Sequence, residues 1–432
     1  MAHRWLTKWL SFWLFAVATV ALSLIYALIY APPNQQIAAQ QQTTTPQPVT
    51  VRFFYTGELL GELGPCGCSG MKQGGMVQRS GWFKQLQQTY PDVIAIDGGF
   101  AAITTGRQPD LKRIIHQRML EALHYRYCFT ASTEAVPTEP TGLATPMVVG
   151  HGKPSIPWHR TETIAGGLRL LVLAIEPQLP TDQELAKVIA DVAPDLVWLM
   201  TKELGSQLTR SLPGEAITIV QPVDAAEPYS PRQVRNQTLL VSAGNRGRYA
   251  GLLELKVSGK QLVEFQNRTI SLEQEYPADE AVESLMENYK TQLKEERLLE
   301  RQIKKISPVG FVGSETCAGC HAYEHERWQT LAHAKAFNIL VKNRHDADPE
   351  CVGCHTVGFA FEEGFRTAEE TAYLMNVGCE ACHGPGAQHA MDQKQPYGKI
   401  ANEFICRTCH EKDRSPKFEF RKYRERIKHW QK

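Results

Sequence analysis

Four copies of the pattern Cys-x-x-Cys-His occur near the C-terminal end of the chain. Two thiols three residues apart can form thioethers to one porphyrin, and the His that follows can ligate the iron. We interpret the four copies as covalent attachment sites for four c-type haems. Their cysteines are Cys317, Cys320, Cys351, Cys354, Cys379, Cys382, Cys406 and Cys409, and their histidines are His321, His355, His383 and His410.

Paired zinc knuckles are the alternative interpretation of these cysteines. Zinc sites also use Cys-x-x-Cys, but they do not require a His directly after every second Cys. The motifs follow one another too closely for a separate apolar core around each. We therefore predict that the haems themselves form the core, close enough to exchange electrons.

Composition limits the other classes of function. The 432 residues carry a formal net charge of +1, so no basic field for nucleic acid is expected. The length allows two or three domains. Outside the motifs lie Cys66, Cys68 and Cys128. These three thiols have two alternative interpretations: a structural disulfide, or a small metal or redox site.

The N-terminus predicts attachment to a membrane. Residues 1–8 include Arg4 and Lys8, and residues 9–31 form an uncharged, mostly apolar run of 23 residues. As a helix this run is roughly 34 Å long, enough to cross a bilayer with the N-terminus inside. A cleaved signal peptide, whose apolar core is shorter, is the alternative. We expect a single-pass anchor in the cytoplasmic membrane, a flexible linker at residues 32–49, and the main body facing the periplasm or cell exterior.

Residues 50–272 predict an α/β sandwich. Apolar runs at residues 51–55, 93–96, 168–175 and 196–200 indicate strands, and residues 111–123 have helical spacing. The run Val-Ser-Ala-Gly-Asn-Arg-Gly-Arg-Tyr-Ala-Gly-Leu-Leu-Glu-Leu at residues 241–255, together with Gly74 and Gly75, resembles the metallophosphoesterase fold of the 5'-nucleotidase family. The resemblance implies that fold for this domain.

The metal ligands of that family are missing here. The family holds two metal ions with Asp and His side chains. The corresponding loops of this sequence are Thr56-Gly57-Glu58, Asp97-Gly98-Gly99, Ser132-Thr133-Glu134 and Thr201-Lys202-Glu203, none of which contains His. Two adjacent cations need several carboxylates and imidazoles, so we expect a scaffold or docking module rather than a hydrolase. An active phosphoesterase is the weaker alternative, and His116, His124, His151 and His159 are expected to be packed or surface residues.

Residues 273–307 predict a connecting segment with an amphipathic helix at residues 279–305. Its apolar positions recur at three- and four-residue steps. Packing against its own chain is the favoured interpretation, and a coiled-coil dimer is the alternative. Residues 308–432 then form the tetrahaem domain, which should be mainly α with little sheet.

The haem region resembles a known family. Residues 317–336, 351–359 and 377–386 are similar to the tetrahaem cytochrome c-554 family of ammonia oxidisers. The resemblance implies an electron carrier near nitrogen-compound oxidation. It also implies that His333 ligates the third haem, that His389 ligates the first, and that the second haem, at His355, is open. His345 is a candidate for the second ligand of that open haem, and His429 is a candidate for the second ligand of the fourth haem. His325 is expected to lie close to the ligands of the first haem or on the surface.

The sequence thus predicts a membrane-anchored tetrahaem c-type cytochrome. It would relay electrons between a redox donor and an acceptor protein, or a quinol-linked complex, at the inner membrane. The alternative is an oxidoreductase that acts on a small nitrogen species at an open haem.

Overall fold

The computed structural model of the chain describes residues 47–65, 73–101, 105–130, 147–150, 158–176, 180–202, 215–235, 237–273, 275–307, 309–395, 397–398, 402–412 and 414–430. Contacts divide the chain into two units, Met1–Pro48 and Val49–Lys432. The predicted anchor at residues 9–31 lies outside the described residues. Within the described ranges no helix is both long and apolar enough to cross a membrane.

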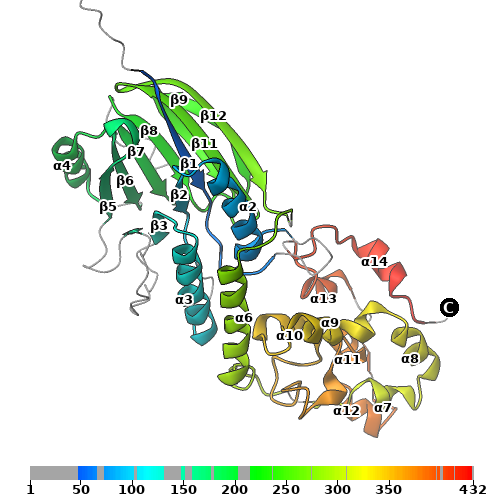
Figure 1. The fold of residues 1–432 in the computed structure, drawn as a ribbon. Coiled ribbons are helices and arrows are strands. Elements are labelled where there is room, and N and C mark those ends of the chain that lie inside the picture. The colour runs from blue at the N-terminus through cyan, green and yellow to red at the C-terminus, as the bar shows by residue number, and fades with distance from the viewer. Residues whose placement is uncertain are drawn as a thin grey trace, which may run out of the picture. The chain divides into compact units, whose positions relative to one another are not determined.

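Two six-stranded sheets form the α/β domain (Figure 1). The first sheet has the order β12-β11-β1-β2-β3-β4 and the second β5-β6-β7-β8-β10-β9. In the first sheet β1, β2, β3 and β4 are parallel, and β11 and β12 add antiparallel pairs at one side. In the second sheet β6, β7, β8 and β10 are parallel, and β5 and β9 are antiparallel edge strands. The first sheet contains β1 (Val49–Tyr55), β2 (Ile94–Asp97), β3 (Tyr127–Thr130), β4 (Met147–Gly150), β11 (Tyr249–Ser258) and β12 (Gln261–Ser271). The second contains β5 (His159–Thr163), β6 (Arg169–Ile175), β7 (Leu196–Thr201), β8 (Ile217–Pro222), β9 (Pro228–Arg235) and β10 (Thr238–Ala243).

Apolar side chains between the two sheets make the main core. The Trp198 ring of β7 lies 4.7 Å from that of Phe53 and 5.5 Å from that of Tyr55, centroid to centroid. Helices α2 (Gly75–Thr89), α3 (Arg107–Ala122) and α6 (Glu280–Glu295) cover the outer face of the first sheet, and α4 (Asp182–Val192) covers that of the second. The layers are therefore helix, sheet, sheet, helix, which confirms the predicted α/β sandwich.

The connecting helix is shorter than predicted. It ends at Glu295 instead of continuing to residue 305. Arg297 has a φ of 55°, and the amide of Leu298 donates to the carbonyl of Leu293 at 3.1 Å. This left-handed residue with its six-to-one hydrogen bond is a common helix stop. The apolar face of α6 is buried against α2 and α3, which supports packing rather than a dimer seam.

Short helices make up the haem-motif region, and strands contribute only isolated bridges among its described residues. Its buried apolar cluster is small: Leu299, Phe337, Leu340, Val352, Val357, Phe365 and Leu374. The prediction of a mainly α region is confirmed. The helices are α7 (Ser314–Ala318), α8 (Ala322–Gln329), α9 (Ala336–Asn343), α10 (Pro349–His355), α11 (Cys379–His383), α12 (Ala387–Met391), α13 (Glu403–Arg407) and α14 (Phe420–Arg426).

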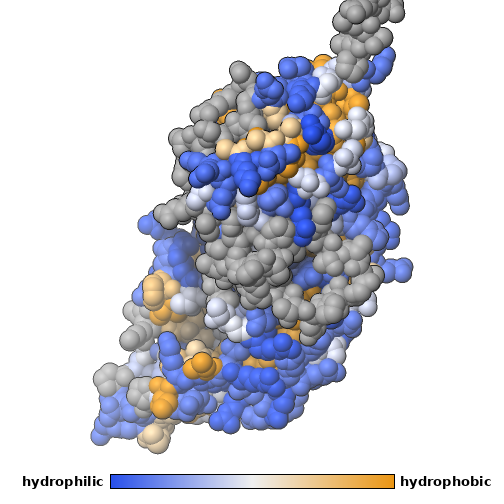
Figure 2. Space-filling model, turned by 90° about the vertical axis from the view of Figure 1, so that its left-hand side faces the viewer, coloured by the Kyte–Doolittle hydropathy of each residue, from blue (hydrophilic) through white to orange (hydrophobic). Residues whose placement is uncertain are grey.

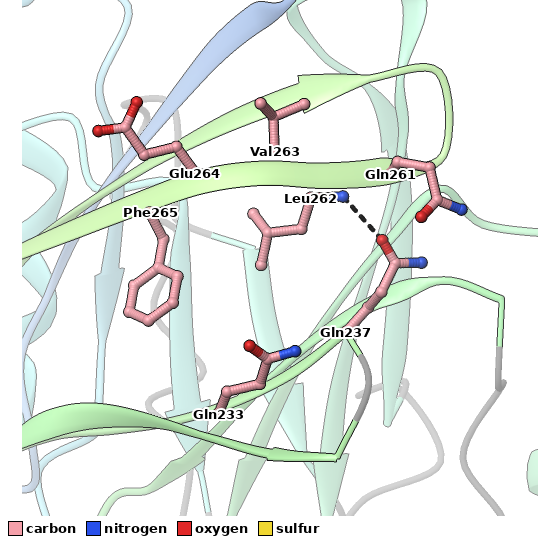
Figure 3. Close-up of a pocket in the computed structure, with 7 residues that line it drawn as sticks. All are labelled: Gln233, Gln237, Gln261, Leu262, Val263, Glu264 and Phe265. Carbon is pink, nitrogen blue, oxygen red and sulfur yellow. Dashed lines mark hydrogen bonds between the residues drawn. The ribbon is translucent and has the colours of Figure 1, made fainter.

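The surface carries hydrophilic residues together with some exposed apolar ones, such as Ile303 and Phe404. Figure 2 shows one face of the molecule, on which hydrophilic residues prevail and hydrophobic residues form smaller areas. A cleft beside β9 and β12 is lined by Gln233, Gln237, Gln261, Leu262, Val263, Glu264 and Phe265 (Figure 3). The Gln237 side chain accepts a hydrogen bond of 2.7 Å from the Leu262 amide there. No haem-motif residue lines this cleft.

Gly251 of the glycine-rich run provides a test of the sheet packing. It pairs with Tyr55 across β1 and β11, and a Cβ at this position would lie 2.1 Å from the Tyr55 ring. We expect Gly251→Ala to lower the free energy of unfolding by about 1–3 kcal/mol, because the buried ring has no room to move. Urea denaturation followed by tryptophan fluorescence measures the change.

Gly310→Ala is the matched control. A Cβ at Gly310 would lie 3.7 Å from the Ala387 Cβ, an ordinary contact. Its effect should stay within about 0.5 kcal/mol. Equal losses in the two variants would contradict the packing described for Gly251.

Candidate functional site

Each haem motif is built on a helical turn. The amide of His321 donates to the Cys317 carbonyl at 2.9 Å, and that of His410 donates to the Cys406 carbonyl at 2.9 Å. The other two motifs lie in α10 and α11. Residues three apart share one face of a helix, so the two thiols of a motif can reach the same porphyrin edge. This donor set fits the covalent haem that the motifs predict.

Local sequence explains why these turns form. The Asp348 side chain caps α10 by accepting from the Glu350 amide at 3.0 Å, and Pro349 occupies the first helical turn. The Asn402 side chain caps α13 by accepting from the Ile405 amide at 3.1 Å. Asp and Asn at the cap and Pro just after it are common helix starts. The second and fourth motifs therefore begin at strong helix starts.

Hydrogen bonds orient two of the predicted proximal histidines. Nδ1 of His355 lies 2.6 Å from the Ala336 carbonyl oxygen, and Nδ1 of His410 lies 3.1 Å from the Ser415 hydroxyl. A partner on Nδ1 leaves Nε2 as the ligating nitrogen, the arrangement usual for metal-bound imidazole. Burial lowers the pKa of His410, which favours the neutral form that a metal requires.

The four motifs are adjacent in an order that differs from the sequence. Cys317 of the first motif lies beside Cys379 of the third, and Cys354 of the second lies beside Cys409 of the fourth. Cys382 of the third motif interacts electrostatically with Cys406 and Cys409 of the fourth. The second motif also adjoins the third, since a Cβ at Gly378, directly before Cys379, would lie 3.1 Å from the Val357 side chain. The four motifs are therefore neighbours in one series, with the second motif beside both the third and the fourth.

Two pairs of imidazoles have the spacing of a doubly ligated iron. The ring centroids of His333 and His410 are 6.2 Å apart, and those of His383 and His429 are 6.1 Å apart. Two imidazoles that ligate one metal from opposite sides have centres roughly 6 Å apart, given metal–nitrogen distances near 2 Å. Burial lowers the pKa of His333, and the nearby imidazoles of His410, His355 and His429 lower it further. This keeps His333 in the ligating, neutral form.

These pairs differ from what the resemblance implied. It assigned His333 to the third haem, whereas the structure places His333 beside the fourth motif's His410. His429, the candidate for the fourth haem, lies beside the third motif's His383. Sequence alone could not separate these two assignments, because the third and fourth motifs are adjacent in space.

The remaining spare histidines have other neighbours. His389 stacks on Tyr397 with centroids 4.9 Å apart, so its assignment to the first haem stays a prediction. His325 is buried, with Nε2 3.3 Å from a Glu315 oxygen, and a surface position for it is wrong. Nδ1 of His345 lies 3.6 Å from Asp348, and these two residues form a potential metal-binding group with Cys351. A thioether at Cys351 would remove that thiolate from such a group.

Cations of the chain itself pair with two buried carboxylates of the α/β domain. Asp97 is completely buried at the end of β2, and Nη1 of Arg79 lies 2.5 Å from its carboxylate. His116 Nε2 lies 3.3 Å from the same carboxylate, and the Gly99 amide donates to it at 2.8 Å. Nearby, Lys202 pairs with Glu58 at 2.5 Å.

The charges of this site are already balanced. Burial alone would raise the pKa of Asp97, but the adjacent His116 and Arg79 lower it well below its usual range. A metal ion would have to displace Arg79 from Asp97 and Lys202 from Glu58. The loss of metal ligands stays a prediction, because residues 132–134 and Glu203 lie outside the described residues.

Sequence reasoning missed two residues of this site. Arg79 lies in the first turns of α2, four residues after Gly75, and its side chain is fully buried. His116 was expected to be an ordinary packed or surface histidine, but it contacts Asp97. An arginine on the apolar face of α2 was the available signal. Cys128 Sγ lies 3.7 Å from Asp97, and the other two non-haem cysteines, Cys66 and Cys68, lie outside the described residues.

The haem-motif region has the features of a c-type cytochrome. Residues 316–384 match the family described as Cytochrome c554 and c-prime. The cytochrome c-554 of Nitrosomonas europaea is 33% identical over 100 residues, which are 20% of this chain and 43% of that protein. This region is therefore similar to cytochrome c-554 and, like it, is expected to bind haem covalently. The chain spans less than half the length of this curated relative.

Solved structures similar to the chain include two nucleotidases. The 5'-nucleotidase precursor of Thermus thermophilus has a TM-score of 0.47 at 16% identity, covering 62% of this chain and 63% of that one. The NAD nucleotidase of Haemophilus influenzae has a TM-score of 0.45 at 10% identity, covering 62% and 64%. The chain thus joins a region that resembles cytochrome c-554 to an α/β domain whose glycine-rich run resembles metallophosphoesterases.

The buried ion pair between Arg79 and Asp97 can be tested by substitution. We expect Arg79→Met to lower the free energy of unfolding by about 3–5 kcal/mol, because Asp97 loses its partner in a fully buried site. Lys84→Met is the control: Lys84 pairs with Asp279 at 3.2 Å but is 51% exposed. The control should lose at most about 1 kcal/mol.

Manganese should not change the unfolding midpoint of the unmodified protein. Ligands that bind the native state raise it, so an unchanged midpoint means that no ion binds. A rise in the midpoint with added manganese, or equal losses in the two variants, would contradict this description of the site.

Proposed function

We propose that the chain is a membrane-anchored c-type cytochrome with four haems that relays electrons on the periplasmic side. The observation that carries this proposal is the adjacency of all four motifs in one series. The resemblance of residues 316–384 to cytochrome c-554 supports the cofactor. The apolar run at residues 9–31 supports the anchor.

The residues of the chain hold and separate the redox centres. A bound c-type haem supplies one-electron chemistry between ferric and ferrous iron. Eight cysteines would fix the porphyrins covalently, and His321, His355, His383 and His410 would ligate the irons from one side. His333 would complete the ligation opposite His410, and His429 that opposite His383, as their ring spacings support. A second imidazole keeps small molecules off an iron, so these two positions suit electron transfer alone.

An oxidoreductase is the second candidate function. Among the described residues, no imidazole ring pairs with His355 as His333 does with His410. An iron with one open side can bind small molecules. In this second candidate function, the iron at His355 would bind a small nitrogen species such as nitric oxide or nitrite. This agrees with the resemblance to cytochromes of ammonia oxidisers. Redox donor and acceptor proteins, or a quinol-linked complex, would be partners of either function.

Protein matured outside the cytoplasm should weigh four porphyrins more than the bare polypeptide. Intact-mass analysis measures this directly. A mass without added porphyrin, or with bound zinc, would refute the proposal. Paramagnetic spectra of the same sample then separate the two functions: high-spin iron that shifts with nitric oxide favours the oxidoreductase, and low-spin iron at every haem favours the carrier.

The pairing of His333 with His410 predicts the effect of replacing one haem ligand. His333→Met should convert one doubly His-ligated haem to His/Met ligation and raise its reduction potential, since a Met ligand raises the potential of c-type haems. An optical redox titration measures the change. His325→Asn is the control, because His325 is buried near Glu315 and has no such pair. The assignment fails if the two variants titrate alike.

A further inference from the structure

Helix α3 of the α/β domain contacts the start of α10, the helix that carries the second haem motif. The Gln108 side chain donates to Asp348 Oδ1 at 2.7 Å. Nζ of Lys112 donates to Glu350 Oε2 at 2.6 Å. Gln108 and Lys112 are four residues apart and therefore share one face of α3. Asp348 lies three residues before Cys351, and Glu350 lies directly before it.

Burial and further hydrogen bonds fix the side chains that make the two contacts. The Lys112 side chain is only 8% exposed and also donates to the Gly61 carbonyl at 3.0 Å, whereas Glu350 is 38% exposed. Gln108 also donates to the Tyr289 hydroxyl of α6 at 3.1 Å. A lysine that has lost most of its water needs its partner, unlike a solvated surface pair. The charge of Lys112 is thus held in place from both sides.

The ion pair lies close to the expected iron. Glu350 and His355 are both in α10, five residues apart, and at 1.5 Å per residue they are separated by roughly 8 Å along the helix axis. A unit charge about 10 Å from an iron, at an effective permittivity near 20, changes a one-electron equilibrium on the order of tenfold. Either charge alone would therefore alter the potential of the second haem measurably.

We propose that Lys112 of the α/β domain sets the reduction potential of the second haem through its ion pair with Glu350. Reduction adds one electron, so a nearby negative charge opposes it and a nearby positive charge favours it. In the native pair, Lys112 offsets the Glu350 carboxylate. The α/β domain would then have an electrostatic role at the second haem.

The second motif lies beside the fourth, with Cys354 next to Cys409. The potential of the second haem relative to that of its neighbour would determine the direction in which electrons pass between them. Lys112 pairs with Glu350, which precedes the motif, and its charge would act on the haem potential from that position. This inference rests on the proposed function, since it requires a haem at Cys351 and Cys354.

Redox titrations of three variants test the proposal. Lys112→Met should lower one of the four midpoint potentials, because Glu350 loses the cation with which it pairs at 2.6 Å and keeps the interaction with Arg414. Glu350→Gln should raise the same midpoint, because Lys112 loses that anion and keeps the interaction with Asp348. Each shift should approach tenfold in the equilibrium, which is 59 mV for one electron. The double variant should return close to the unmodified value, since both charges are gone.

Two controls identify the haem and the charge effect. Lys84→Met removes a lysine charge that pairs with Asp279 at 3.2 Å, away from the haem motifs, and should leave all four midpoints unchanged. His355→Met should move the same midpoint that the Lys112 and Glu350 variants move. If Lys112→Met does not fold, Glu350→Gln carries the test by itself, because Glu350 is more than one-third exposed.

The outcomes separate this inference from the proposed function. Absence of porphyrin mass from the unmodified protein refutes the proposed function. Four haems with midpoints that do not move, or that move in the same direction in both single variants, overturn the role of Lys112 alone. Loss of packing would shift both single variants in one direction, so opposite signs are the result that only the charge mechanism gives.

Discussion

One covalent constraint underlies the C-terminal region: two thiols and an imidazole must sit on a single helical turn. Short helical turns satisfy it at each motif and leave few apolar side chains for packing. The apolar cluster around Phe337 and Val352 is small for so long a segment. Covalently bound haem, which the similarity to cytochrome c-554 implies, would add apolar contact in this region.

The α/β domain pairs its buried carboxylates with cations of its own chain. Arg79 pairs with Asp97, and Lys202 pairs with Glu58. Buried charges of this kind are costly unless paired, so each carboxylate requires a cation nearby. Helix α3 contributes His116 to the Asp97 site and Lys112 to the contact with the haem-motif region, one helical turn apart.

Spacing and apolar periodicity predicted much of this structure. The four motifs, the buried strands and the α/β class follow from local patterns that need no partner. Other features depend on residues far apart in sequence, such as Arg79 with Asp97 or Lys112 with Glu350, and no local pattern indicates them. The early end of α6 also escaped prediction, because a non-glycine residue at Arg297 takes the left-handed conformation. The pairing of His333 with His410 required the order of the motifs in space.

The left-handed turn at Arg297 has a consequence for how the two cores are joined. It directs Leu298 into the core beneath α3 and the next residue, Leu299, into the core beside α10. Two consecutive side chains thus anchor the backbone in both cores. No flexible tether separates the sandwich from the haem-motif region at this point of the described chain.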